Sequence, residues 1–217
     1  ELVCLYGRRR VGKTELVNKF LEMLGGERKV YYLSDTMSKK KQLSNFSNAI
    51  AAEFKDGTLA RQPFGEWDDA FYYLSKHGEK AVIAIDEFPY LVSEDAGLPG
   101  IIQKYWDSTI KKTGLKIVLC GSSFSFMGNL LGHGSPLYGR FTGEWQVEPL
   151  GFAEATAFFP TLSLIARSSF TFSVPGTSTR VKTFTFPFRS AKSKRTSLIF
   201  LSCKERLSPK RSETKFW

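Results

Sequence analysis

Cysteine and histidine are scarce in this sequence of 217 residues. The three cysteines, Cys4, Cys120 and Cys203, lie far apart and form neither a C-x-x-C pair nor a zinc-binding spacing, and the two histidines, His77 and His133, argue against a His-rich metal site. Isolated cysteines of this kind favour a reducing, cytoplasmic compartment. No apolar run approaches about twenty residues, so we expect no membrane-spanning helix. The chain begins with Glu inside an apolar run, so we expect no signal peptide and regard the sequence as a fragment.

Acidic residues are nearly missing from the last quarter of the chain. Residues 161–217 contain 12 Lys and Arg but only 2 Asp and Glu, which accounts for the whole formal net charge of +10. Residues 1–160 contain 19 basic and 19 acidic residues and are neutral as a set. A basic balance is typical of proteins that bind nucleic acid. Here, any such argument applies to the tail alone.

The composition changes near residue 160. Residues 161–217 contain no Asp, Asn, Gln, Tyr, His or Met, and 19 of them are Ser or Thr. We therefore predict one domain over residues 1–159 and an irregular, basic, Ser/Thr-rich tail over residues 160–217. Two alternating stretches, 170–174 and 184–188, have the pattern of short strands. Three interpretations stay open: a small basic β-element that contacts nucleic acid, a disordered extension, or translation out of frame.

Before this boundary, apolar strands alternate with amphipathic helices. Residues 81–85 are apolar at every position, which is typical of a parallel strand covered on both faces. The alternation predicts an α/β domain with a parallel sheet and right-handed crossovers. The expected strands cover residues 2–6, 30–33, 81–85, 117–120 and 145–147, and the expected helices cover residues 14–24, 43–54, 67–74, 101–110, 124–131 and 153–159.

Residues 7–14, with the sequence GRRRVGKT, match the phosphate-binding pattern G-x-x-x-x-G-K-[ST]. An apolar strand precedes them and an amphipathic helix follows, which is the context that the motif requires. The two glycines allow a tight turn and close approach to phosphates, and the backbone N–H groups and helix N-terminus attract an anion. The expected ligand-binding residues are Gly7, Arg8, Arg9, Arg10, Val11, Gly12, Lys13 and Thr14. Lys13 would contact the β and γ phosphates, and the hydroxyl of Thr14 would hold Mg²⁺.

Two carboxylates, Asp86 and Glu87, stand at the carboxyl end of the most apolar strand. Parallel strands deliver these ends to the ligand-binding edge of a sheet. Asp86 is expected to hold Mg²⁺, and Glu87 to polarise an attacking water. A water-activating Glu favours hydrolysis over transfer to a small substrate.

Two further residues are candidates for catalysis. Ser122 closes the next strand, where its hydroxyl would sense the γ-phosphate, or else would serve as a helix N-cap. Arg140 lies in a glycine-containing loop before the last strand. It is either a charge-stabilising finger acting within or between chains, or an ordinary surface arginine.

On the basis of these motifs, the sequence resembles the archaeal-type ATPases, which are P-loop proteins related to the AAA+ and STAND groups. The resemblance covers residues 1 to about 159 and is carried by residues 5–14, 85–91, 119–123 and 135–150. It implies a three-layer P-loop NTPase fold with a parallel sheet in the order 5-1-4-3-2, and ATP with Mg²⁺ as ligand. It also implies that Lys13 and Thr14 belong to the Walker A motif and that Asp86 and Glu87 form the Walker B pair, with Glu87 as base and Ser122 as sensor.

The chain departs from this family at both ends. Members begin with a further segment before the first strand and continue past residue 160 into a helical lid and a winged-helix region, which residues 161–217 do not resemble. We predict Mg²⁺-dependent hydrolysis of ATP coupled to a DNA or protein partner, in a ring or a monomer. The alternatives are an ATP-operated switch with little turnover, a kinase of a small substrate, and an inactive fragment.

Overall fold

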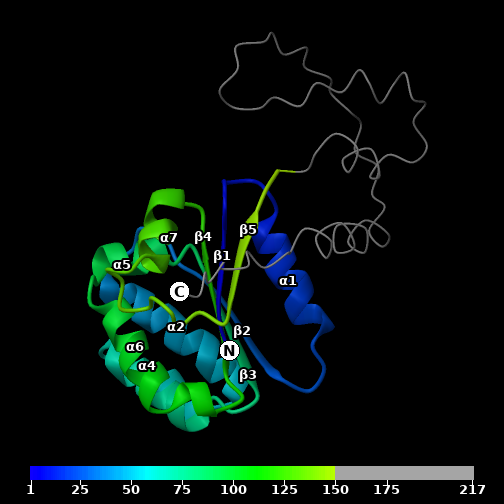
Figure 1. The fold of residues 1–217 in the computed structure, drawn as a ribbon. Coiled ribbons are helices and arrows are strands. Elements are labelled where there is room, and N and C mark those ends of the chain that lie inside the picture. The colour runs from blue at the N-terminus through cyan, green and yellow to red at the C-terminus, as the bar shows by residue number, and fades with distance from the viewer. Residues whose placement is uncertain (150–217) are drawn as a thin grey trace, which may run out of the picture. The chain divides into compact units, whose positions relative to one another are not determined.

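The computed structural model describes residues 1–149. In this part of the chain the strands and helices alternate (Figure 1). The strands are β1 (Leu2–Gly7), β2 (Arg28–Leu33), β3 (Ala81–Asp86), β4 (Lys116–Gly121) and β5 (Gly143–Val147). The helices are α1 (Lys13–Met23), α2 (Lys39–Phe54), α3 (Gly57–Arg61), α4 (Trp67–His77), α5 (Pro89–Glu94), α6 (Leu98–Ser108), the 3-10 helix η1 (Ile110–Lys112) and α7 (Phe124–Leu131).

All five expected strands and the first five expected helices are present. The structure adds the two short helices α3 and α5, which the apolar pattern did not predict. The expected helix over residues 153–159 and the two stretches 170–174 and 184–188 lie outside the described residues, as does the predicted boundary near residue 160.

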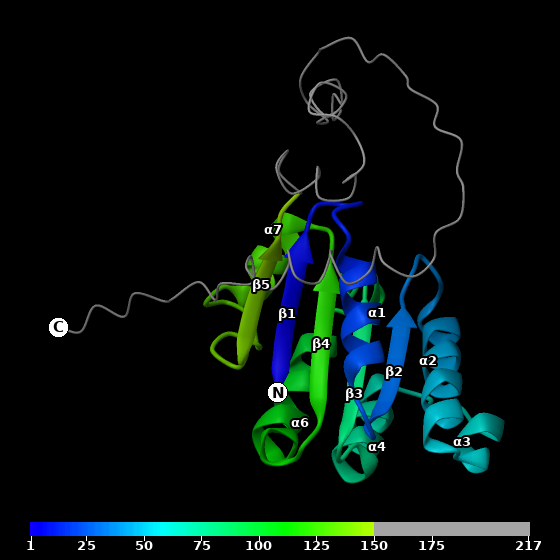
Figure 2. The same cartoon turned by 90° about the vertical axis from the view of Figure 1, so that its right-hand side faces the viewer.

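The five strands form one sheet in the order β2-β3-β4-β1-β5, and every pairing is parallel (Figure 2). Read from the other edge, this is the predicted order 5-1-4-3-2. Because the strands are parallel, their carboxyl ends meet at one edge of the sheet. That edge therefore collects the residues that follow β1, β2, β3 and β4.

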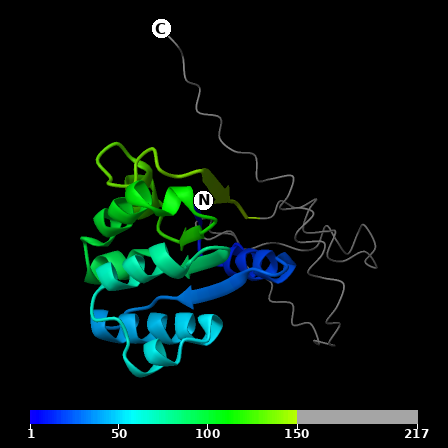
Figure 3. The same cartoon turned by 90° about the horizontal axis from the view of Figure 1, so that it is seen from below.

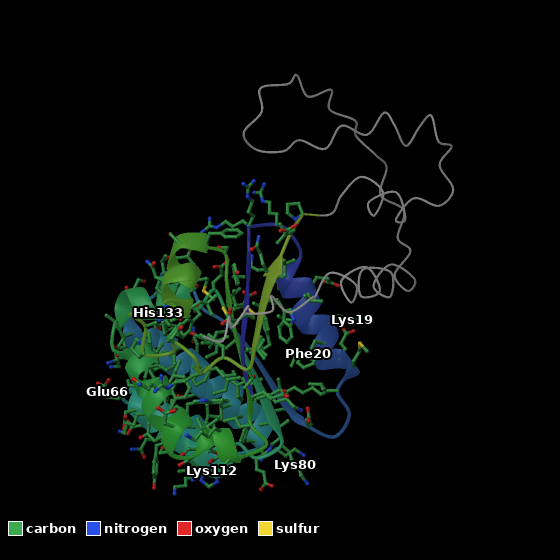
Figure 4. All side chains as sticks on the ribbon, in the orientation of Figure 1. Lys19, Phe20, Glu66, Lys80, Lys112 and His133 are labelled. Carbon is green, nitrogen blue, oxygen red and sulfur yellow. The ribbon has the colours of Figure 1, made fainter. Side chains whose placement is uncertain are left out.

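Helices lie on both faces of the sheet and complete three layers. Helices α2, α4 and α6 cover one face, and α1 packs on the other (Figures 1 and 3). The labelled side chains follow the same division, with Lys19 and Phe20 of α1 on one side of the sheet and Glu66, Lys112 and His133 on the other (Figure 4). All six residues of β3 are buried, because this strand lies inside the sheet between β2 and β4.

On the face of the sheet that α2, α4 and α6 cover, the core contains several aromatic side chains. Phe46 of α2 stacks between Tyr32 of β2 and Trp67 of α4, with ring centroids 5.3 Å from each. Fully buried aromatic side chains contribute much of the hydrophobic free energy of a core. This packing fixes β2 against β3 from one face and leaves the carboxyl edge of the sheet for polar residues. Among the described residues, no helix is both long and apolar enough to cross a lipid bilayer.

Candidate functional site

The loop between β1 and α1 contains two residues with left-handed backbone and is held by hydrogen bonds from a lysine. Arg10 and Gly12 have positive φ angles of 66° and 95°. Backbone of this kind lets successive N–H groups converge on an anion. Lys13 is only 6% exposed, and its ammonium group donates to the carbonyls of Gly7 and Arg8, both at 3.0 Å. A phosphate oxygen is a stronger acceptor for this ammonium than a neutral carbonyl is.

Gly7 is required for a reason other than the turn assumed from the sequence. It pairs with Val147 of β5, and a Cβ atom added at Gly7 would lie 2.2 Å from the carbonyl oxygen of Val147. The absence of a side chain thus allows β5 to approach the strand that leads into the loop. Gly12, with its left-handed φ, does have the conformational role that the motif predicts.

Asp86 is brought against the loop, as predicted. Its side chain is 2% exposed and accepts three hydrogen bonds. The hydroxyls of Thr14 and Tyr31 donate to Oδ2 at 2.7 and 2.9 Å, and the backbone N–H of Glu87 donates to Oδ1 at 2.9 Å. Thr14 is the second residue of α1, which follows β1, and Asp86 ends β3. The contact therefore joins segments on either side of β4, which lies between β1 and β3. Within residues 1–149 no salt bridge reaches Asp86.

Glu87 has a left-handed backbone, with φ of 53°. Such a conformation is costly for a residue other than glycine, and it is found where neighbouring structure enforces it. Ser34, just after β2, supplies that structure. Its N–H and hydroxyl donate to the carbonyl of Asp86 at 3.0 and 2.9 Å, and its hydroxyl also lies 2.6 Å from the carbonyl of Glu87.

The side chain of Glu87 points toward the end of β4. Its Oε2 accepts the hydroxyl of Ser122 at 2.9 Å and the backbone N–H of Ser122 at 3.3 Å. Ser122 thus contacts one member of the acid pair, and its role as a sensor stays a prediction, while the N-cap of α7 is the next residue, Ser123. Arg9 extends from the loop over the same group, with Nε 3.5 Å from the Ser122 hydroxyl and Nη2 2.8 Å from the hydroxyl of Tyr90. Arg8 and Arg10 are exposed.

Arg140 is not part of this group. Its guanidinium donates twice to Oδ2 of Asp107, at 3.0 and 2.7 Å, and holds the pKa of that carboxyl below its ordinary value. Arg140 precedes β5, and a parallel strand begins at the edge opposite its carboxyl end. The structure thus places Arg140 away from the loop of its own chain, because it pairs with the end of α6. A role as a finger acting on a neighbouring chain stays a prediction.

Two residues of this site were missed from the sequence. Tyr31 and Ser34 belong to β2 and the segment that follows it, and they contact Asp86 and Glu87. Their polar atoms near the carboxyl end of a strand were the available signal, together with the order 5-1-4-3-2, in which the second strand lies beside the third. Burial, together with the hydrogen bond to Asp86, raises the pKa of Tyr31, so its hydroxyl stays protonated and acts as a donor.

The oxygen atoms of Thr14 and Asp86 are of the kind that bind a hard divalent cation. Thr14 Oγ1 and Asp86 Oδ2 lie 2.7 Å apart, and all partners of the buried carboxylate are neutral. No group of three or more His, Cys, Asp or Glu side chains occurs in the described part of the chain. A carboxylate and a hydroxyl would leave the other positions around a cation such as Mg²⁺ to water and to the phosphates of a substrate.

Comparison with known proteins identifies the family of the chain. A family model described as an ATPase domain predominantly from Archaea matches residues 1–168. The uncharacterized protein MJECL04 of Methanocaldococcus jannaschii is 34% identical over 161 residues, which are 74% of this chain and 34% of that protein. A second protein of the same organism, MJ0424, is 44% identical over 57 residues, which are 25% of this chain and 55% of that protein.

A solved structure, the Walker-type ATPase PABY2304 of Pyrococcus abyssi, matches with a TM-score of 0.48 and 24% identity, over 69% of this chain and 49% of that one. The chain thus spans between about a third and just over half of the proteins it matches. Since the family model covers more than two thirds of the sequence and includes every residue of the site, the chain belongs to the archaeal family of P-loop ATPase domains.

Proposed function

We propose that this domain binds ATP together with Mg²⁺ and hydrolyses the bond between the β and γ phosphates. The observation that carries the proposal is the hydrogen bond between Thr14 and Asp86, at 2.7 Å. It joins the phosphate loop to the acid pair, so that an anion-binding loop, a buried carboxylate and a second carboxylate share one edge of the sheet. Family membership supports ATP as the nucleotide.

Each residue of the site has a role in this proposal. Lys13 exchanges its two carbonyl partners for the β and γ phosphates. Thr14 and Asp86 hold Mg²⁺, which supplies neutralisation of the charge on the phosphates. Glu87 accepts a proton from the attacking water or orients it, and Ser122 keeps the Glu87 carboxylate in place through two donors.

Two substitutions separate binding from turnover. We expect Lys13→Ala to abolish nucleotide binding in calorimetry, because the ammonium is the buried cation of the loop. We expect Glu87→Gln to bind Mg²⁺ and ATP as the parent does while the rate of phosphate release falls about 100-fold or more, which is typical for loss of a general base.

Two variants farther along α1 serve as matched controls. Lys19→Ala removes a lysine whose only salt bridge within residues 1–149 is to Glu22, and Glu22→Gln makes the same chemical change as Glu87→Gln at an exposed position. Both should retain binding and turnover. Parental turnover by Glu87→Gln would show that Glu87 is not the base, and ATP binding by Lys13→Ala would end the proposal for the loop.

A second function, a nucleic-acid-associated switch with little turnover, is favoured by one observation. Residues 161–217 carry the whole excess positive charge of the chain. Binding to DNA through such a segment should weaken steeply as salt rises, because phosphate contacts release counterions. In this case DNA binds the full chain at low salt and increases the rate of ATP hydrolysis. A rate that is the same with and without DNA would contradict this function and leave the first one standing.

A further inference from the structure

Tyr31 is the one residue of β2 whose hydroxyl reaches the acid pair. It lies opposite Ala84 in the parallel register, two residues before the pair formed by Leu33 and Asp86. Its side chain leans along the strand and donates to Asp86 Oδ2 at 2.9 Å. The hydroxyl thus contacts the same oxygen as the hydroxyl of Thr14.

We propose that Tyr31 is a positioning residue that orients the Asp86 carboxylate for the divalent cation bound with the nucleotide. This inference rests on the proposed function. It assigns to Tyr31 no contact with the nucleotide or with the reacting atoms.

The difference between the two hydroxyls on Oδ2 supports this role. Thr14 is an exposed residue at the start of α1, directly after the loop that must rearrange around phosphate. Tyr31 belongs to a strand that is hydrogen-bonded to β3 along its whole length, from Arg28 to Leu33. Among the described residues, Tyr31 is therefore the only side-chain donor to Asp86 that comes from the sheet itself. Binding sites held by regular elements are more rigid than those held by loops.

The two oxygens of Asp86 are held from different directions. The Glu87 amide fixes Oδ1, and Tyr31 fixes Oδ2 from the neighbouring strand. Together they limit rotation of the carboxylate about its last bond. Without Tyr31 only Thr14 would hold Oδ2, so the orientation of Asp86 would depend on the state of the loop.

The adjacent residue shows what a structural tyrosine of this strand looks like. Tyr32 points to the opposite face, is 5% exposed, and donates to the backbone carbonyl of Gln42 at 3.2 Å as well as to its side chain. Its hydroxyl serves the packing of α2. The hydroxyl of Tyr31 meets Asp86 instead, so it serves the site.

The test compares Tyr31→Phe with Tyr32→Phe in the full chain. Each variant loses one hydroxyl and keeps its ring. Calorimetry measures the affinity for a non-hydrolysable ATP analogue, once with Mg²⁺ and once with EDTA. For Tyr31→Phe we expect the affinity with Mg²⁺ to fall about tenfold, as is usual when a residue that orients a metal ligand is lost. The affinity in EDTA should change less than twofold.

For Tyr32→Phe we expect a lower melting temperature and an unchanged ratio between the two affinities. If Tyr31→Phe leaves that ratio at the parental value, the assignment of Tyr31 is wrong although the proposed function stands. An equal loss under both conditions also overturns it, because it indicates a structural or nucleotide-contacting role. If Mg²⁺ does not strengthen binding to the parent protein, the proposed metal site fails, and the role of Tyr31 fails with it.

Discussion

The contact between Gly7 and β5 gives the sharpest prediction for the architecture of the site. An alanine Cβ at this position would lie 2.2 Å from the carbonyl oxygen of Val147, which is 0.8 Å inside the 3.0 Å that real Cβ contacts respect. The obstacle is backbone, so no side-chain rotation relieves it. Within residues 1–149, β5 is an edge strand that pairs with β1 alone, so it can shift outward. Overpacking of this kind costs about 1–3 kcal/mol.

For a chain of this length, each kcal/mol lowers the melting temperature by about 2–4 °C. We therefore expect Gly7→Ala to melt about 5 °C below the parent in calorimetry. It should also bind ATP more weakly, because Gly7 ends β1 and leads into the phosphate loop, so a shift of its backbone displaces the residues that would contact the phosphates. Gly128→Ala is the matched control. Gly128 is exposed in α7 with nothing within 4 Å of an added Cβ, so this change should be neutral or stabilising by up to about 1 kcal/mol. A Gly7→Ala protein with parental stability would refute the close packing of β5 on the phosphate-loop strand.

Three further predictions concern the buried cysteines and Arg140. Burial raises the pKa of Cys4 to about 12 and that of Cys120 well above its ordinary value. In a Cys203→Ser background we therefore expect no reaction with a thiol reagent at pH 8 until the protein unfolds. Rapid labelling of the native state would show that Cys4 and Cys120 are not buried. The same shifts mean that unfolded thiols ionise before folded ones, so the free energy of unfolding should fall between about pH 9 and pH 12 in denaturant titrations. Arg140→Ala removes one partly exposed pair with Asp107, so we expect a stability loss of at most about 1 kcal/mol and an unchanged rate of ATP hydrolysis at every protein concentration. A rate that falls only at concentrations where chains associate would indicate a finger supplied to a neighbouring chain.

The order of elements was readable from the sequence because each strand and each long helix has its own apolar period. The uninterrupted apolar run of β3 indicated a strand covered on both faces, and the structure confirms it. The short helix α5 was not predicted, because six residues that begin with Pro89 are too few to show a helical period. Helix α3 was missed for the same reason, since its only buried residue is Leu59.

The site was predictable where it depends on motifs and unpredictable where it depends on neighbours. Thr14 and Asp86 meet as the motifs indicate, and Ser122 lies beside Glu87. The contributions of Tyr31 and Ser34 follow from the pairing of β2 with β3, which no local pattern in the sequence specifies. A parallel neighbour is chosen by crossovers and packing over long separations, so side chains that act across strands become visible only in the folded structure.

The hydrogen-bond partners at the site explain why its two buried ionic residues, Lys13 and Asp86, do not neutralise each other. Lys13 is buried, yet its ammonium is bound by two carbonyls, and Asp86 is buried, yet its three donors are neutral. A direct ion pair between them would have to be broken before phosphate and cation could enter, and breaking a buried pair is costly. Neutral partners satisfy the hydrogen bonds of both groups and leave their charges uncompensated. The free protein therefore keeps the hydrogen bonds of Lys13 separate from those of Asp86, which supports the proposal that one binds phosphate and the other a cation.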